Sequence, residues 1–424
     1  MTALATEPAV PQAATGTARR VLLAPITITP SKPLTPSHLK GLLWTDVMYR
    51  ATRSLAHVTH HCSHTTYHPT EQTLGFWEFL DRTEGDTDYD DLTEEDIGAL
   101  YVAFRAAPRP SARDLRPYAE AAERGWVHPA STRVLTLWSG HYARLGLHDP
   151  GLLRYQPPGL GLDAALDRLT GLGMCLDQRA VGGPVFLDLT RHGLPLRRLV
   201  TADGRPNYLA CALRELLPIA AGFDEVVLLY DTELDADQQQ LARVLSALGP
   251  SVRRVPIGRV PIDGQIRSAR QGGWEGLHAG ALLDAAADRD PAVVRLGMRL
   301  YFIAVLGPGQ QQSFRPDLLD QSLKRAERLL ASAQQSQSQP QPQPQAQMQP
   351  QPQPQPQPQA QMQPQPQPPA QSQPPVQPQP EPLAARLARH RKDHTYVDPY
   401  RLTSGLLGRR RAAPGLDLLT SVYL

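Results

Sequence analysis

The feature that most constrains this chain is a strand-like run that passes through a proline-bearing turn into a helical pattern. Residues 20–28 are mostly apolar, and apolar residues then recur at helical spacing over 39–51. Pro36 suits the first turn of the helix, and Thr35 or Ser37 can cap it. Phosphate groups bind at such helix starts in α/β proteins, because free N–H groups and the helix dipole meet there. The pattern therefore predicts either a phosphate-binding loop or an ordinary strand-to-helix turn.

Strand-like runs alternate with helical patterns along most of the chain. The strands are expected at residues 21–28, 185–189, 226–230 and 252–257, and helices between them at 208–221 and 238–248. Amphipathic helical patterns at 114–147 and 162–176 are expected to form an insertion between the two halves. This alternation predicts an α/β fold in which helices cover both faces of a parallel sheet.

Residues 331–382 consist almost entirely of Gln and Pro, and an Ala-Gln-Met-Gln-Pro unit that begins at Ala346 recurs at Ala360. Proline removes backbone donors and glutamine offers little apolar surface, so this tract is expected to be a disordered, solvated spacer. A neutral expanded repeat and a ligand for a protein that reads Pro-rich segments are both open interpretations.

Charge and composition exclude several classes of protein. The 424 residues carry 43 Lys and Arg against 41 Asp and Glu, so no global field favours nucleic acid or an anionic membrane. Cys62, Cys175 and Cys211 lie far apart, which fits a reducing compartment. No apolar run reaches the roughly 18 residues of a membrane span. We expect a soluble cytoplasmic protein without a membrane partner.

Several segments, in the same order along the chain, resemble the motifs of class I arginyl-tRNA synthetases. They lie at residues 30–41, 72–76, 99–102, 142–146, 185–189, 199–209 and 223–230. The first resembles the HIGH region of that family, and the run 199–209 resembles its Arg-x-Asp-Gly-Thr-x-x-Tyr-Leu signature. The resemblance implies a Rossmann-like, doubly wound parallel sheet with a helical insertion. It also implies ATP and Mg²⁺ as cofactors and an amino-acid-like ligand.

The resemblance also divides the chain into segments. A disordered N-terminus is expected over 1–18, a synthetase-like catalytic domain over 19–292 and a remnant helical stem over 293–330. The Gln/Pro spacer over 331–382 and a basic helical tail over 383–424 follow. The tRNA-reading domains of the family have no counterpart, so the chain is expected to be a divergent, truncated paralogue that binds tRNA weakly or not at all.

The HIGH-like segment departs from the family pattern. Thr35 matches the first histidine, Ser37 matches the glycine against which adenine packs, and His38 matches the second histidine. Lys32 and Lys40 flank this segment as further candidates for contacts to phosphate. Capping of the helix start and contact with a phosphate group are both open roles for His38. A hydroxyl in place of an imidazole gives up one possible donor to the transition state, worth about 3 kcal/mol.

The mobile loop that carries a Lys-Met-Ser motif (KMSKS) in the family is expected at residues 264–273. Gln265 stands where the lysine belongs, which removes a positive charge from the leaving group. Arg267 and Arg270 could replace that charge, and Ser268 is a further candidate for nucleotide contact. A solvated basic loop is the alternative interpretation.

The residues implied to select the amino acid are altered as well. Tyr208 is kept, whereas Ala212 stands where the family has an aspartate. A guanidinium without a carboxylate partner in a closed pocket is costly, so arginine should not be the preferred ligand. Gln72 is a candidate for substrate contact, and Asp231 and Glu233 could supply carboxylates or form a capped surface turn.

Six potential metal ligands crowd into twelve residues. They are His57, His60, His61, Cys62, His64 and His68. Imidazole and thiolate are ligands that zinc prefers, but the spacing fits no closed structural site. A zinc site and a polar loop are both open interpretations, and no residue is assigned as a metal ligand.

Three hypotheses for function follow. The first is an arginyl-tRNA synthetase-like protein that is weak or inactive in arginine charging. The second is an ATP-dependent ligase that activates another carboxylate through an acyl-adenylate. The third is a scaffold that presents the Gln/Pro tract to a protein partner.

Overall fold

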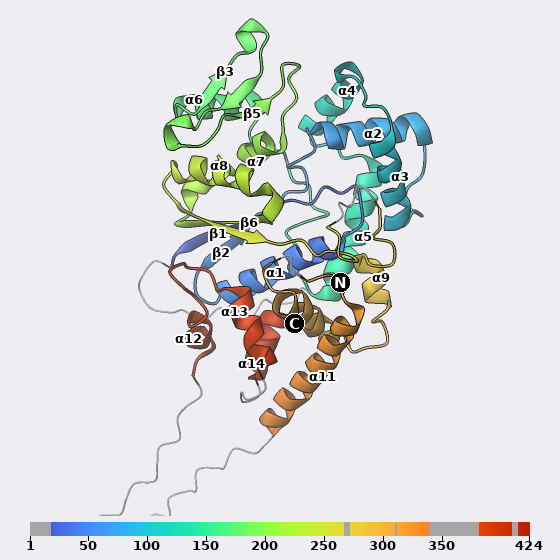
Figure 1. Ribbon diagram of the computed structural model, residues 1–424, viewed down its shortest axis with the longest axis vertical. Helices are drawn as coiled ribbons and strands as arrows, with labels where there is room; N and C mark the ends of the chain where they lie inside the picture. The colour runs from blue at the N-terminus through green and yellow to red at the C-terminus, as the bar shows by residue number, and fades with distance from the viewer. Residues whose placement is uncertain (1–17, 267–271, 310–311, 339–380, 409–413) are drawn as a thin grey trace, which may run out of the picture.

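The computed structural model describes residues 18–266, 272–309, 312–338, 381–408 and 414–424 (Figure 1). The predictions for Arg267, Ser268 and Arg270, and those for most of the Gln/Pro tract, lie outside these residues. Among the helices that the structure describes, none combines the length and the apolar character needed to cross a bilayer.

A parallel sheet forms the centre of the structure, as the sequence predicts. Its four strands lie in the order β2-β1-β6-β7. They are β1 (Arg20–Pro25), β2 (His57–His60), β6 (Glu225–Asp231) and β7 (Ser251–Ile257). Every pairing is parallel, with Leu23 opposite Val227 and Leu229 opposite Val255. The prediction of a parallel α/β fold is confirmed.

Helices cover both faces of this sheet. They include α1 (Pro36–Thr52) on one face, and α7 (Tyr208–Leu216) and α8 (Asp235–Ser246) on the other. Alternate residues of β1 point to opposite faces. Val21 and Leu23 belong to the core beneath α1, whereas Leu22 and Ala24 belong to the core beneath α7 and α8. The sheet is therefore doubly wound.

The prediction that residues 185–189 form a strand of the parallel sheet is wrong. This run forms β4 in a separate antiparallel sheet with the order β3-β4-β5, which lies above the main sheet (Figure 1). Its strands are β3 (Cys175–Asp177), β4 (Val185–Leu187) and β5 (Arg197–Val200). The helical pattern at 162–176 ends early, as α6 (Leu162–Gly171), because Gly171 and Gly173 precede β3. The pattern at 208–221 likewise ends at Leu216, close to Pro218.

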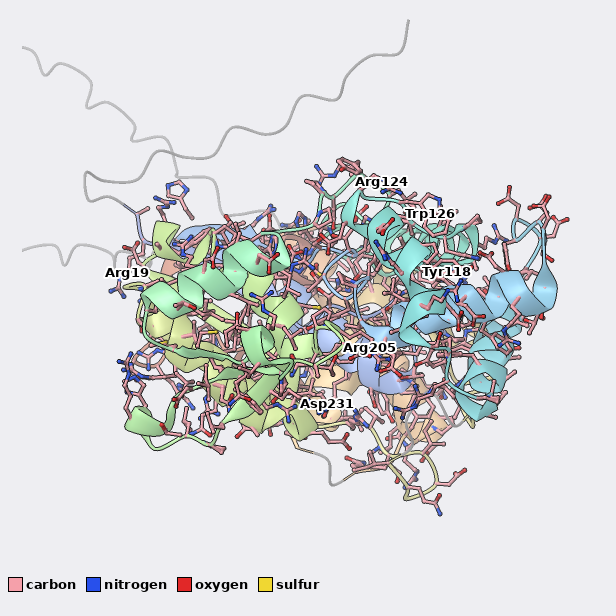
Figure 2. All side chains as sticks on the ribbon, turned by 90° about the horizontal axis from the view of Figure 1, so that it is seen from above. Arg19, Tyr118, Arg124, Trp126, Arg205 and Asp231 are labelled. Atoms are coloured by element: carbon pink, nitrogen blue, oxygen red, sulfur yellow. The ribbon has the colours of Figure 1, made fainter. Side chains whose placement is uncertain are left out.

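A helical insertion lies beside the strands. Its members are α2 (Glu71–Glu84), α3 (Glu94–Ala106), α4 (Ala112–Glu123) and α5 (Pro129–Leu145). The pattern expected at 114–147 falls on α4 and α5, whereas α2 and α3 are not among the helices that the sequence analysis assigns to the insertion. Thr93 and Ser111 cap α3 and α4 through their hydroxyl groups. Arg205, from the loop before α7, pairs with Glu71 of α2 at 3.1 Å and so joins the insertion to the α/β part. Seen from above, Arg205 and Asp231 lie between these two parts (Figure 2).

Most of the last segments pack beneath α1. They are α10 (Pro291–Arg299), η6 (Leu300–Val305), α11 (Pro316–Ser338), α12 (Leu383–Ala388), α13 (Pro399–Ser404), α14 (Leu416–Leu418) and η8 (Leu419–Tyr423). Helix α9 (Ala279–Asp284) packs against α5 instead. Helix α11 continues to Ser338, eight residues beyond the expected end of the stem, and buries Ala333. Leu387, Val397 and Tyr423 of the tail are fully buried in the core that contains α1. The tail is therefore part of the packed structure.

Candidate functional site

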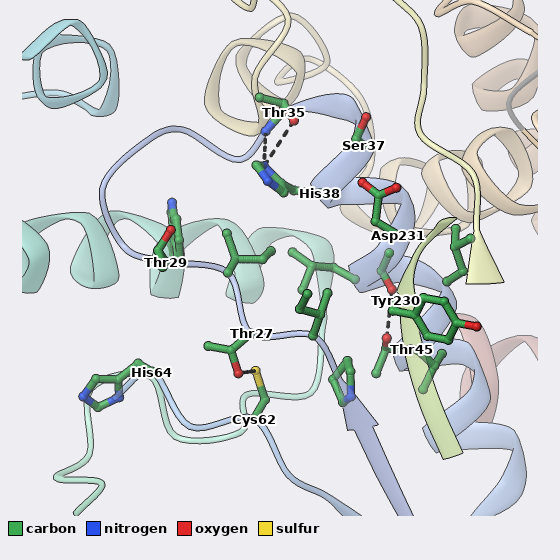
Figure 3. A pocket seen from close by; sticks show the side chains of 18 of the residues that line it. Thr27, Thr29, Thr35, Ser37, His38, Thr45, Cys62, His64, Tyr230 and Asp231 are labelled. Carbon is green, nitrogen blue, oxygen red and sulfur yellow. Dashed lines mark hydrogen bonds between the residues drawn. The ribbon is translucent and has the colours of Figure 1, made fainter. Parts of the chain in front are cut away.

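A cavity of about 320 Å³ lies at the carboxyl ends of the parallel strands (Figure 3). Its floor includes Ile26 after β1, Leu229 of β6 and Ile257 of β7. From β1 the chain turns through α1 to β2 on one side, whereas β6 lies on the other side, so the strand order reverses at this point. Ligands of open α/β sheets bind at such a reversal.

The start of α1 forms one end of the cavity, and His38 lies in its first turn. The Thr35 N–H donates to His38 Nδ1 at 3.1 Å, and the Thr35 hydroxyl lies 3.1 Å from the same nitrogen. Burial, with the nearby charges of Lys32 and Arg259, lowers the pKa of His38 to about 3. The imidazole is therefore neutral, and because Nδ1 accepts, its proton belongs on Nε2. His38 thus completes a capping box with Thr35, the N-cap of α1, and it lines the cavity as a neutral ring that also hydrogen-bonds to the Pro33 backbone.

Three further residues of the HIGH-like segment have different surroundings. Ser37 lines the cavity, but its Oγ accepts a hydrogen bond from the Val260 N–H at 3.0 Å. Lys32 also lines it, and its Nζ donates to Thr29 at 3.3 Å and lies 5.4 Å from the centre of the Tyr101 ring. Lys40 is buried outside the described lining and donates to the Gly309 carbonyl at 2.7 Å. Burial lowers the pKa of Lys40 to about 8.

An arginine that the sequence analysis missed stands beside Asp231. Arg259 follows β7, its Nε donates to Asp231, and its Nη1 lies 2.9 Å from Glu233. Asp231 and Arg259 line the cavity, whereas Glu233 belongs to the turn that Asp231 caps. The position of Arg259 could have been predicted from the sequence, because it follows a strand next to the one that ends at Asp231. The carboxyl ends of neighbouring parallel strands meet at one edge of a sheet.

The far end of the cavity is lined by polar and aromatic side chains, which we call the neutral wall. Its members are His60, Cys62, His64, Tyr67, Tyr142 and Tyr208. The rings of Tyr67 and Tyr208 meet edge to face at 4.8 Å, and Cys62 Sγ lies 3.7 Å from the Thr27 hydroxyl. Gln72 and Tyr208 both line the cavity, and their contact with a substrate stays a prediction.

Several members of the neutral wall have shifted pKa values, and each of these groups is uncharged near pH 7. Burial lowers the pKa of His60 to about 4 and raises the pKa of Cys62 to about 11. Burial also lowers the pKa of His64 and raises the pKa of Tyr67 and Tyr142.

The histidine-rich segment begins as a strand rather than a loop. His57–His60 form β2, which pairs with β1, and this pairing separates the side chains along the edge of the sheet. Within the ranges that the structure describes, no three His, Cys, Asp or Glu side chains gather in a way that could hold a metal ion.

Asp46 is the cavity carboxylate nearest the neutral wall, and it is already paired. Arg299 Nη2 lies 2.5 Å from it and Arg50 Nε 3.0 Å, while the His148 N–H donates to it at 2.9 Å. Burial opposes ionisation of Asp46, but the two guanidinium groups hold its pKa below the usual range. Ala212, which the sequence analysis compared with a family aspartate, does not belong to the described lining of this cavity. It lines a smaller neighbouring cavity.

A buried glutamate fixes the loop that precedes α1. Glu94 Oε2 accepts hydrogen bonds from the Leu34 N–H at 3.3 Å and from Trp138 Nε1 at 3.2 Å. Glu94 also pairs with His141 and lies 3.8 Å from His278. Burial opposes its ionisation, but hydrogen bonds from the two histidines lower the pKa of Glu94 to about 2. These partners are distant in sequence and form no recognisable motif, so the sequence analysis missed them.

The loop expected to close over a nucleotide is described only in part. Ile262 and Gln265 exchange backbone hydrogen bonds of 2.9 Å in a tight turn. Gln265 is exposed and does not belong to the described lining of the cavity. Arg267, Ser268 and Arg270 lie outside the described residues.

The comparison with solved structures finds similarity to arginyl-tRNA synthetases. The arginyl-tRNA synthetase of Thermus thermophilus matches with a TM-score of 0.55 and 15% identity, over 76% of this chain and 64% of that one. The enzyme of Plasmodium falciparum matches with a TM-score of 0.49 and 11% identity, over 75% and 58% of the two chains. No protein-family model matches the chain, and no curated protein matches its sequence.

The chain therefore has an aminoacyl-tRNA synthetase-like α/β fold. More closely, it is a divergent domain with the fold of the arginyl-tRNA synthetases, and it spans less than two thirds of the Thermus chain. The resemblance found in the sequence is confirmed for the fold.

Proposed function

We propose that this protein binds a small amino-acid-like ligand in the cavity and does not charge arginine onto tRNA. The observation that carries the proposal is the pairing of the carboxylates in the described lining. Asp46 is held by Arg299 and Arg50, and Asp231 by Arg259. A guanidinium in the cavity would have to break one of these pairs or remain unpaired, and either is costly.

The start of α1 fits a tightly held nucleotide poorly. The Thr35 N–H, which would face a phosphate, already donates to His38, and the Ser37 hydroxyl already accepts from Val260. The paired state of Asp46 and Asp231 also leaves no carboxylate of the described lining available to a magnesium ion. We expect ATP to bind with a Kd no tighter than about 1 mM.

Two assays on the full chain test this proposal. Calorimetry should give no ATP affinity tighter than the millimolar range, and arginylation of tRNA should not exceed a control without enzyme. Micromolar ATP binding would contradict the nucleotide part, and arginylation above the control would contradict the proposal as a whole.

The alternative function is an ATP-dependent ligase that activates a carboxylate other than arginine. Its support is the position of Lys32 beside the neutral His38 ring, in a cavity at the carboxyl ends of the parallel strands. Magnesium and ATP would be its cofactors, and ATP exchange that depends on another carboxylate would favour it. For both candidate functions we propose a cytoplasmic protein for which tRNA is at most a weak ligand. We further propose that the Gln/Pro tract is a spacer that a protein partner could bind.

A further inference from the structure

We propose that the ligand is a neutral amino acid, whose α-ammonium and α-carboxylate groups bind beside α1 and whose uncharged, apolar or aromatic side chain lies against the neutral wall. This inference rests on the proposed function and names the class of ligand for the same cavity. It follows from the distribution of charge in the described lining.

Charges of both signs gather at the α1 end. Lys32 and Arg259 lie close enough to His38 to shift its titration, and Asp231 lies beside Arg259. Figure 3 shows His38 and Asp231 at one end of the cavity, while Cys62 and His64 lie at the other. A zwitterion placed here would present its carboxylate to Lys32 and its ammonium group to Asp231, as a second donor beside Arg259. This contact is the same for every amino acid, so it does not select the side chain.

The opposite end offers apolar surface and neutral polar atoms. Leu135, Trp138, Leu147 and Leu152 line the cavity together with the neutral wall. His64 is buried, and its Nδ1 has no hydrogen-bond partner in the structure. A side chain placed here would lose its water and gain aromatic and aliphatic contacts, which favours an uncharged group.

Near the neutral wall, a charged side chain of the ligand would find no available group of opposite charge in the described lining. Asp46 is neutralised by Arg299, which is fully buried, and by Arg50, so a cationic side chain would meet no unpaired carboxylate of the described lining. Burial keeps His60 neutral, with a pKa of about 4, so it offers an anionic side chain no cation near pH 7. Both kinds of charged side chain would therefore be bound less tightly than a neutral one.

Calorimetric titration of the full chain with L-phenylalanine, L-leucine, L-arginine and L-glutamate tests this inference. Phenylalanine or leucine should bind at least tenfold more tightly than arginine and glutamate. Preferred or equal binding of arginine or glutamate would overturn the inference but leave an amino-acid site in place. If none of the four binds at up to 10 mM, roughly the weak limit of calorimetry, the proposed function fails as well.

A matched pair of variants tests the position of the side chain. Cys62→Asp places a carboxylate in the neutral wall and should lower phenylalanine affinity at least tenfold without lowering arginine affinity. Val181→Asp adds the same charge at an exposed site, 84% accessible, and should change neither. Gln72→Glu is a second, isosteric change in the lining that keeps the test valid if a buried aspartate prevents folding. An unchanged ratio of phenylalanine to arginine affinity in folded Cys62→Asp or Gln72→Glu protein would contradict the inference.

Discussion

At the scale of single residues, His38 has a structural role at the edge of the cavity. Its Nδ1 closes the start of α1, and burial holds the ring neutral. The sequence analysis identified His38 because Lys32, Thr35, Ser37 and His38 lie in one short segment that resembles a family motif. Arg259 and Glu94 act on the same site from distant segments, and only the folded chain shows their proximity.

The buried histidines predict loss of stability in acid. Burial lowers the pKa of His38 to about 3 and that of His60 to about 4, against 6.5 for an exposed histidine. The unfolded chain therefore binds more protons between these values, so the stabilising contribution is complete above pH 6.5 and falls as the pH decreases. Urea unfolding of His38→Asn, compared with the parent between pH 7.5 and pH 5, should show a shallower decline. An equally steep decline in both proteins would contradict the assigned state of His38.

At the scale of elements, the ion pair between Asp46 and Arg299 joins α1 to α10. Both side chains are almost fully buried, and Arg299 also donates to the Leu145 carbonyl at the end of α5 at 2.9 Å. Three elements that are distant in sequence therefore meet on one guanidinium group beside the cavity.

We predict that Arg299→Met destabilises the fold by about 3 kcal/mol, because it leaves the carboxylate of Asp46 buried with one partner fewer. Chemical denaturation measures the change. The control is Arg116→Met, which removes an exposed pair with Glu120 on α4 and should cost less than about 1 kcal/mol. Equal losses in the two variants would show that the buried pair contributes no more than a surface pair.

The elements also show what can be predicted from sequence. The long periodic patterns gave β1, β6, β7 and α8 at nearly their observed places, because their apolar residues alternate between the two faces of the sheet or recur along one helix face. The antiparallel sheet was missed because β3 contains three residues, too few for a period to emerge, and because β4, although expected as a strand, was assigned to the parallel sheet. Strand β2 was missed because its histidines suggested a metal-binding loop.

At the scale of the whole molecule, the C-terminal tail returns to the core. Thr395 donates to Glu225 at the amino end of β6, and the Val397 N–H donates to Thr52 at the end of α1 at 3.0 Å. Val422 and Tyr423 are fully buried in the core beneath α1. The tail therefore covers the core at the amino end of β6 and the end of α1.

Removal of residues 383–424 should lower the Tm of the folded part by more than about 5 °C, because it exposes several apolar side chains of the core. Deletion of residues 339–380 is the matched control, and it should change the Tm little because its Gln and Pro residues offer little apolar surface. Differential scanning calorimetry of both deletions compares them. A larger loss from the 339–380 deletion would contradict the structural role of the tail.

The central claim is that a synthetase-like cavity no longer serves arginine. The most direct measurement is the exchange of labelled pyrophosphate into ATP by the full chain, with each amino acid supplied in turn and a sample without amino acid as the baseline. The account predicts that arginine does not raise exchange above this baseline, because Asp46 and Asp231 are already paired with arginines of the protein. Arginine-dependent exchange above the baseline would contradict it.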